Sequence, residues 1–444
     1  MNLIGRDADL GSLARSDATG TGTYCVVTGR RGVGKTAFLH TFGAGRNCVF
    51  LTPIGANGPE ILKSLAEALD IGHEVDNLGE IVAAFKNDPK VRTTYIIDDL
   101  QEILRTVDGS EETLIGFIEN ELRNLNIFLV LSIRRGTFPR IENLDSVMVL
   151  NPLRYRFARL LHPDMTEEDR MKMYFIAGGI PAYHLGLDMD TAKESVTYKI
   201  CDSQSFFLSD TECEIRSCRP DDTAVTVLGS IASGCRSLKD IAYSSNISEP
   251  AAIKVLKSLI DRGTVSRDDS IGGSKQARYH ICDPPVLFFL TMAAGIRALW
   301  GHEPEYIYSK LKDQLNEFYS VRFDELCLEY TSEMDGCVEC GRWWNKDSEI
   351  QIIARYVRAG QESFLLGDSK YKNKKAGMKR LEDLQERRES VRDIANVGYI
   401  LFSRMGFTDE LIAYSRDPSH RVELVAPEDM HRSRELLKDS LDTV

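Results

Sequence analysis

The sequence predicts an α/β protein with a parallel sheet covered by helices on both faces, a helical middle, and a second α/β unit. Two observations support this prediction. Short apolar runs alternate with helical patterns over residues 1–150, which is typical of a parallel sheet with right-handed crossovers. After residue 300 a long helical pattern precedes several strand-like runs. The chain has 444 residues, 43% of them hydrophobic, so each of several domains can bury a core.

The first 150 residues are predicted to hold five strands and at least three helices. The strands are Tyr24–Thr28, Cys48–Thr52, Tyr95–Ile97, Ile127–Ile133 and Val147–Leu150. Apolar residues recur at helical spacing in Glu60–Leu69, Ile81–Phe85 and Thr113–Leu125. The strands are apolar along their length, as expected when helices cover both faces of the sheet.

The middle of the chain changes from a mainly helical segment to helices with a hairpin. In residues 151–220 a helix is predicted to start at Thr166 and to end at the turn Gly178–Pro181. In residues 221–285 three helices precede a hairpin that turns at Gly272-Gly273, which together make a winged helix. These three helices are Asp222–Ile231, Leu238–Tyr243 and Glu249–Arg262.

The last part, residues 300–444, is predicted to be α/β. A helix at Tyr306–Thr331 comes first, and basic helical sequence runs from Lys370 to Arg392. The strand-like runs are Glu349–Ala354, Ser363–Leu366 and Val397–Phe402.

A complete phosphate-binding loop lies between the first strand and the first helix that follows it. Its residues match G-x-x-x-x-G-K-[ST] as Gly29, Arg30, Arg31, Gly32, Val33, Gly34, Lys35 and Thr36. The glycines let the backbone curl so that successive N–H groups and the helix N-terminus face the β- and γ-phosphates. Lys35 would pair with phosphate oxygens, and the Thr36 hydroxyl would bind Mg²⁺. The sequence therefore predicts an ATP·Mg²⁺ site.

Two carboxylates end the strand at Tyr95–Ile97, as in a Walker B site. Asp98 would hold Mg²⁺ through its water shell, and Asp99 would orient or deprotonate the attacking water. An aspartate is one methylene shorter than the glutamate usual in AAA-type enzymes, so slow turnover is expected. Ser132, which ends the strand predicted at Ile127–Ile133, is the candidate polar sensor. Arg134 or Arg135 could approach the γ-phosphate, although a solvated or interface role is the favoured interpretation.

Several segments together resemble the archaeal AAA/STAND-like P-loop ATPases that carry a winged helix and a C-terminal PD-(D/E)xK nuclease-like domain. The segments are Ile4–Leu10, Ile97–Gln101, Ala177–Tyr183, Tyr279–Pro284 and Gly341–Trp344. The resemblance implies that Arg6 lies near the adenine. It also implies a P-loop ATPase core at 1–150, a helical lid at 151–220, a winged helix at 221–285 and a nuclease-like domain at 300–444.

A nuclease site of that family needs an Asp and, on the next strand, an (Asp/Glu)-x-Lys. Asp368 and Lys370 supply the second element, but Gln351 stands where the family pattern places the first Asp. A neutral amide binds Mg²⁺ poorly compared with a carboxylate. Glu349 could substitute from the same strand face, and Asp324 or Glu325 could give another carboxylate. The sequence therefore predicts a degenerate metal site.

Basic residues gather between Lys370 and Arg380 in a chain whose net charge is −12. They could contact DNA phosphates without sequence preference, or they could form a solvated helix face. In the predicted winged helix, Lys254, Lys257 and Arg262 could face a DNA groove, but packing against the nucleotide domain is the favoured interpretation.

The other features of the sequence limit the kind of protein that is expected. The N-terminus lacks a signal-peptide pattern, no apolar stretch is long enough to span a membrane, and the ten cysteines are scattered, so a cytoplasmic protein is expected. Cys337 and Cys340 form one C-x-x-C without a second ligand pair, which disfavours zinc. Three functions fit: an ATPase switch coupled to DNA, a protein partner or a homo-oligomer; an ATP-gated nuclease; and an ATP-binding signalling scaffold.

Overall fold

The computed structural model describes residues 3–18, 20–85, 90–217, 223–358 and 360–431. The predicted boundary between residues 220 and 221 lies outside these ranges. The chain forms two compact units. One contains residues 1–153 with 180–182 and 261–263, and the other contains the remaining residues. The described helices include none long and apolar enough to cross a membrane.

A five-stranded parallel sheet forms the centre of the first unit, as predicted. Its strands are β1 (Thr23–Gly29), β2 (Cys48–Leu51), β3 (Thr93–Ile97), β4 (Ile127–Arg134) and β5 (Val147–Val149). Their order is β2-β3-β4-β1-β5, so β4 lies between the P-loop strand and the strand that precedes Asp98. The strand that contains Ser132 therefore pairs with both of them.

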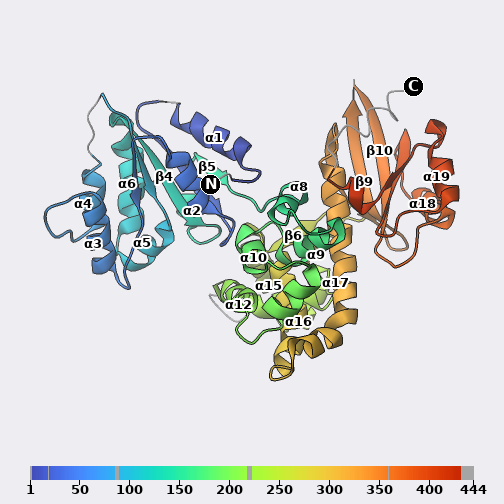
Figure 1. Ribbon diagram of the computed structural model, residues 1–444. Coiled ribbons are helices and arrows are strands. Elements are labelled where there is room, and N and C mark those ends of the chain that lie inside the picture. Colours follow the sequence, from blue (N-terminus) through green and yellow to red (C-terminus); the bar gives the residue numbers. More distant parts are fainter. Residues whose placement is uncertain (1–2, 19, 86–89, 218–222, 359, 432–444) are drawn as a thin grey trace. The chain divides into compact units, whose positions relative to one another are not determined.

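Helices cover both faces of this sheet (Figure 1). Successive residues of β4 point to opposite faces: Leu129 packs in one core cluster with α3–α6, and Phe128 packs in the other with α1 and α2. The helices of this unit are α1 (Asp7–Asp17), α2 (Lys35–Gly43), α3 (Gly58–Ala68), α4 (Leu78–Ala83), α5 (Leu100–Thr106), α6 (Ser110–Asn120) and α7 (Pro139–Glu142).

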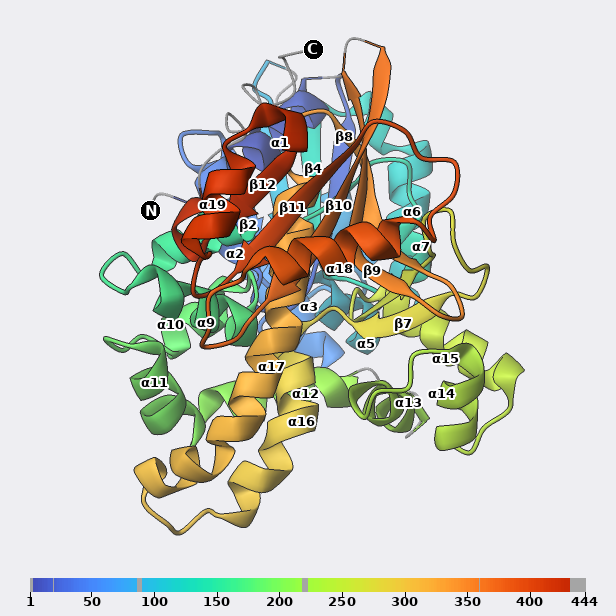
Figure 2. The ribbon, with the colours of Figure 1, turned by 90° about the vertical axis from the view of Figure 1, so that its right-hand side faces the viewer.

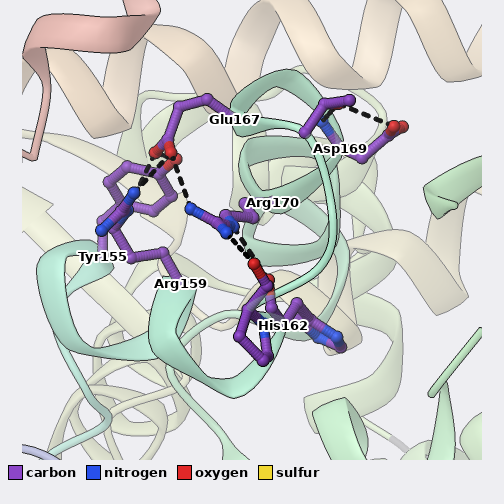
Figure 3. Close-up of polar contacts among 8 residues, drawn as sticks. Tyr155, Arg159, His162, Glu167, Asp169 and Arg170 are labelled. Carbon is purple, nitrogen blue, oxygen red and sulfur yellow. Dashed lines mark hydrogen bonds and ion pairs between the residues drawn. The ribbon is translucent and has the colours of Figure 1, made fainter. Parts of the chain in front are cut away.

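The second unit begins with short helices, and one of them, α9, begins where the sequence predicts it. The Thr166 side chain accepts a hydrogen bond from the backbone N–H of Asp169 and caps α9 (Glu167–Ala177). The Glu167 carboxylate accepts hydrogen bonds from Tyr155, Arg159 and Arg170, which fixes the segment before α9 to its first turn (Figure 3). The other helices are α8 (Tyr155–Ala158), α10 (Pro181–Gly186), α11 (Ala192–Glu194), a π-helical turn (Ser195–Ile200) and α12 (Phe206–Ser217).

Three helices and a hairpin follow, in the predicted order. They are α13 (Thr223–Ala232), α14 (Leu238–Ser244), α15 (Glu249–Asp261), β6 (Val265–Asp268) and β7 (Arg278–Ile281). Apolar side chains of α13, α15 and both strands share one core cluster. Two longer helices, α16 (Pro284–Ala298) and α17 (Pro304–Ser332), lead to the last sheet.

The C-terminal sheet has the order β12-β11-β10-β9-β8, with β10 antiparallel to β9 and parallel to β11. Helix α17 lies on one face, and α18 and α19 lie on the other (Figures 1 and 2). Helix α18 spans Met378–Arg388, so the helix predicted from Lys370 to Arg392 is wrong over 370–377 and 389–392. The elements are β8 (Cys337–Trp344), β9 (Glu349–Arg358), β10 (Gln361–Lys370), α18 (Met378–Arg388), β11 (Val397–Ser403), α19 (Asp409–Ser415) and β12 (Val422–Val425).

Candidate nucleotide-binding site and C-terminal carboxylate site

The P-loop connects the end of β1 to the start of α2 through glycines with positive φ. Gly32 has φ 78° and Gly34 has φ 95°, backbone conformations that side-chain-bearing residues rarely adopt. A Cβ on Gly29 would lie 2.7 Å from the carbonyl oxygen of Leu150. These three glycines therefore allow both the curled loop and its close approach to the segment after β5.

Lys35 and Arg6 both contact the loop backbone. The Lys35 ammonium donates to the carbonyl oxygens of Gly29 at 3.0 Å and of Arg30 at 3.2 Å. The Arg6 guanidinium donates to the Val33 carbonyl oxygen at 3.3 Å, and burial lowers its pKa. Arg6, which directly precedes α1, thus supports the loop through its hydrogen bond to Val33. The Lys35 ammonium lies against the loop backbone, where a bound phosphate could take the place of these carbonyl oxygens.

Thr36 and Asp98 meet directly. The Thr36 hydroxyl donates to Asp98 Oδ2 at 2.6 Å, and Asp98 is 3% exposed. The backbone N–H of Asp98 donates to the Leu51 carbonyl on β2, so the carboxylate sits at the carboxyl end of the sheet. A hydroxyl and a carboxylate oxygen this close are hard ligands of the kind that Mg²⁺ prefers, so this pair fits the ion.

Asp99 starts α5 in the left-handed region, with φ 46° and ψ 43°. Its carboxylate accepts a hydrogen bond from Gln101 Nε2 at 2.9 Å, and Gln101 Oε1 accepts from the backbone N–H of Arg134 at 3.0 Å. Gln101 was not predicted as a functional residue, although it belongs to the quoted Ile97–Gln101 segment. Its position two residues after Asp99 was the available signal.

Ser132 lies on β4 opposite Val27 of β1 and is fully buried. Its hydroxyl has no hydrogen-bond partner within the described part of the chain. A buried hydroxyl of this kind needs an explanation such as a bound water. The sensor role of Ser132 stays a prediction.

Glu142 is a second residue that the sequence did not indicate. Its carboxylate accepts from the backbone N–H groups of Gly136, Thr137 and Phe138 at 2.8, 2.9 and 3.2 Å. The Thr28 hydroxyl donates to the same carboxylate at 3.3 Å. This carboxylate fixes the loop after β4 beside the strand end that enters the P-loop.

In the C-terminal sheet the Asp368 carboxylate faces α18. It is 3% exposed and forms ion pairs with Arg380 and, at 3.1 Å, with Arg387. Burial raises the pKa of Asp368, while the two guanidinium groups oppose this shift. Two cations therefore occupy the surroundings of the carboxylate that would hold a metal ion in a nuclease site.

Gln351 and Asp324 lie next to Ser369 rather than in a set of metal ligands. The Ser369 backbone N–H donates to Gln351 Oε1 at 2.9 Å, and the Ser369 hydroxyl donates to Asp324. Burial raises the pKa of Asp324 to about 6. Glu349, predicted as a possible substitute ligand, instead pairs with Arg278 at 2.8 Å. Over the described residues, no group of three or more His, Cys, Asp or Glu could hold a metal ion. The residues present do not fit Mg²⁺ here.

The segment after Asp368 is basic and largely exposed. The Lys370 ammonium donates to the Lys375 carbonyl at 3.0 Å. Burial and the charges of Arg380, Lys374 and Lys372 lower its pKa, so these cations lie near one another. Lys372, Lys374 and Lys375 are exposed, and none of them forms an ion pair with a described carboxylate. The charges of this segment therefore remain available to an anionic partner.

The hairpin next to α15 is fixed to the edge of the C-terminal sheet. The backbone N–H groups of Ile271 and Ser274 donate to the carbonyls of Arg342 and Trp344 at 3.1 and 2.8 Å. Arg342 also pairs with Asp268 at 3.0 Å. The tip of this hairpin is thus occupied by intramolecular contacts with β8.

Comparisons with known proteins give a partial match. A family model described as DUF234, archaeal and bacterial proteins of unknown function, matches residues 295–381. The curated relative MJECL04, an uncharacterised protein of Methanocaldococcus jannaschii, is 20% identical over 383 residues, which cover 79% of this chain and 84% of the relative.

Solved structures similar to this chain include a Walker-type ATPase, a protein in complex with DNA and a RuvB mutant. The Walker-type ATPase paby2304 of Pyrococcus abyssi is 16% identical, covers 65% of this chain and 96% of its own, and has a TM-score of 0.47. The Aeropyrum pernix ORC1 protein in complex with DNA is 15% identical, covers 67% and 95%, and has a TM-score of 0.31. A RuvB mutant of Thermotoga maritima is 14% identical, covers 60% and 90%, and has a TM-score of 0.33.

Proposed function

We propose that this chain is an AAA/STAND-like switch ATPase that binds ATP·Mg²⁺ and hydrolyses it slowly. The observation that carries the proposal is the complete P-loop together with the 2.6 Å hydrogen bond from Thr36 to Asp98. These two residues come from elements 62 positions apart in sequence. Their meeting at the start of α2 is the arrangement that a Walker A and Walker B pair needs.

Each site residue has a distinct proposed role. The backbone N–H groups of residues 29–36 and the Lys35 ammonium bind the phosphates, while Thr36 and Asp98 hold Mg²⁺, which would neutralise phosphate charge. Asp99 orients or deprotonates the water that attacks the γ-phosphorus. A bond forms from that water oxygen to phosphorus, the bond from phosphorus to the β,γ-bridging oxygen breaks, and ADP leaves. Ser132 acts as the sensor.

The remaining residues are proposed to couple nucleotide state to a partner. We assign residues 151–220 as a lid, 221–285 as a winged helix and 300–444 as a nuclease-like domain. Exposed lysines at 372, 374 and 375 support contact with DNA phosphates. The proposal also allows the nucleotide state to be coupled to a protein partner or to another copy of the chain in a homo-oligomer.

The two alternative functions are less well supported. A nuclease gated by ATP needs a metal at Asp368, but the ion pairs of Asp368 with Arg380 and Arg387 argue against one. A scaffold that binds ATP without turnover is consistent with the short Asp99 side chain. Measured hydrolysis separates it from the proposal.

The central experiment compares Lys35→Ala with Lys63→Ala, a control on α3 whose side chain is 78% exposed. Nucleotide affinity is measured with a fluorescent ATP analogue, and turnover is measured by phosphate release. We expect Lys35→Ala to lose both binding and turnover while it unfolds at the same temperature as the wild type. Unchanged affinity and turnover in Lys35→Ala would refute the proposed function.

A further inference from the structure

Gln101 is a buried amide beside an exposed carboxylate. Its side chain is 2% exposed, and both ends of the amide are hydrogen-bonded. Nε2 donates to Asp99 Oδ1 at 2.9 Å, and Oε1 accepts from the Arg134 N–H at 3.0 Å. Because an ionised carboxylate can only accept and a backbone N–H can only donate, the chemistry of the two partners fixes which end of the amide faces each.

Arg134, which donates its N–H to the Gln101 amide, lies next to the P-loop. Arg134 pairs with Gly29 in the register of β4 and β1, and the next backbone N–H, of Arg135, donates to the Gly29 carbonyl at 3.2 Å. The Lys35 ammonium donates to the same carbonyl at 3.0 Å. Gln101 therefore joins Asp99 to the strand end that is hydrogen-bonded to the phosphate-binding loop.

The Asp99 end needs such a support. Asp99 lies in the left-handed region at the start of α5, and its side chain is exposed. Among the described residues, Gln101 supplies the one side-chain hydrogen bond to this carboxylate. An exposed carboxylate without that bond would sample several rotamers, and a water held by it would lose its orientation.

We propose that Gln101 is a positioning residue that orients the Asp99 carboxylate for the attack of water on the γ-phosphate of ATP. The inference rests on the proposed function and adds a residue that acts through Asp99 rather than on the nucleotide. It also predicts that the donor end of the amide matters for turnover more than the acceptor end.

The test separates the two ends of the amide. Gln101→Glu retains an acceptor for the Arg134 N–H but cannot donate to Asp99, and it places a like charge beside that carboxylate. Gln101→Ala removes both bonds. Arg105→Gln is the control, because it lies on the same helix and lowers the net charge by one, as Gln101→Glu does. The full chain is used, and the measurements are kcat and KM for ATP, ATP-analogue affinity, and thermal unfolding.

We expect Gln101→Glu and Gln101→Ala to lower kcat by about tenfold to a hundredfold with little change in KM, since a hydrogen bond to a charged group is lost. Arg105→Gln should keep the kcat and KM of the wild type. Wild-type kcat in Gln101→Glu, or a loss fully explained by its unfolded fraction, overturns the proposal. A wild-type chain that binds ATP without hydrolysing it also overturns it, whereas absence of ATP binding overturns the proposed function itself.

Discussion

Neutralising the exposed lysines after β10 should weaken the proposed DNA binding and reduce the dependence of the DNA affinity on salt concentration. The perturbation is the triple substitution of Lys372, Lys374 and Lys375 by Gln. All three side chains are exposed, and they lie beside Lys370 and Arg380 in the basic segment. Binding to a fluorescent DNA duplex is measured by anisotropy in EDTA, so that no metal-dependent cleavage can interfere.

The expected magnitude follows from counterion release. Each lost phosphate contact removes about 0.9 from the slope of log affinity against log salt, so three contacts remove about 2.7. Between 50 and 200 mM salt, roughly 0.6 of a decade, the wild-type affinity should fall by about 40-fold more than that of the variant. At low salt the variant should bind more weakly.

A matched control distinguishes local contact from net charge. Lys199, Lys312 and Lys346 are exposed and lie outside the basic segment, and their substitution by Gln changes the net charge equally. The control should retain the wild-type slope. Parallel salt dependences for the wild type and the Lys372/Lys374/Lys375 variant would refute the assignment of this segment as a phosphate-contacting surface.

Three further predictions concern carboxylates. Asp99→Asn should trap bound ATP whereas Asp98→Asn weakens Mg²⁺-dependent binding, and hydrolysis at the wild-type rate in Asp99→Asn would exclude Asp99 as the catalytic carboxylate. Gln351→Asp alone should not produce Mg²⁺-dependent nicking of plasmid DNA, because Asp368 stays paired with Arg380 and Arg387, and strong nicking by this variant would contradict that interpretation of the site. Burial raises the pKa of Asp324 from 3.8 to about 6, so its contribution to stability is present below pH 3.8 and is lost as pH rises through about 6. Asp324→Asn retains an acceptor for Ser369. Between pH 4 and pH 7 its free energy of unfolding should rise relative to that of the wild type by up to about 3 kcal/mol. A difference in urea unfolding that does not change with pH would contradict this prediction.

The first sheet could be predicted because its strands are buried on both faces. Apolar runs such as Ile127–Ile133 carry that pattern in the sequence itself, and the P-loop fixes the direction of the chain between β1 and α2. Strand β8 was not predicted, because its residues do not follow a regular strand pattern. Its register shifts after Cys337 and after Gly341, so the alternation of inward and outward residues is interrupted.

The segment 370–377 shows why the helix predicted from local composition begins too early. Its lysines favour helical structure, but Tyr371 and Ala376 are buried by tertiary contacts. The Ala376 N–H donates to the Gly406 carbonyl, and its carbonyl accepts from Thr408, both at 2.9 Å, which holds the chain extended. Partners such as Gly406, 30 residues away in sequence, leave no signal in a local pattern.

The chemistry of the C-terminal site depends on the same kind of distant pairing. The sequence identified the loss of one carboxylate at Gln351, which by itself leaves Asp368 able to attract a cation. In the structure Arg380 and Arg387 bring two positive charges to that single carboxylate, so a divalent ion would have to displace both guanidinium groups. The same two arginines thus oppose metal-dependent cleavage at Asp368, and the proposed contact of the basic segment with DNA does not require a metal ion there.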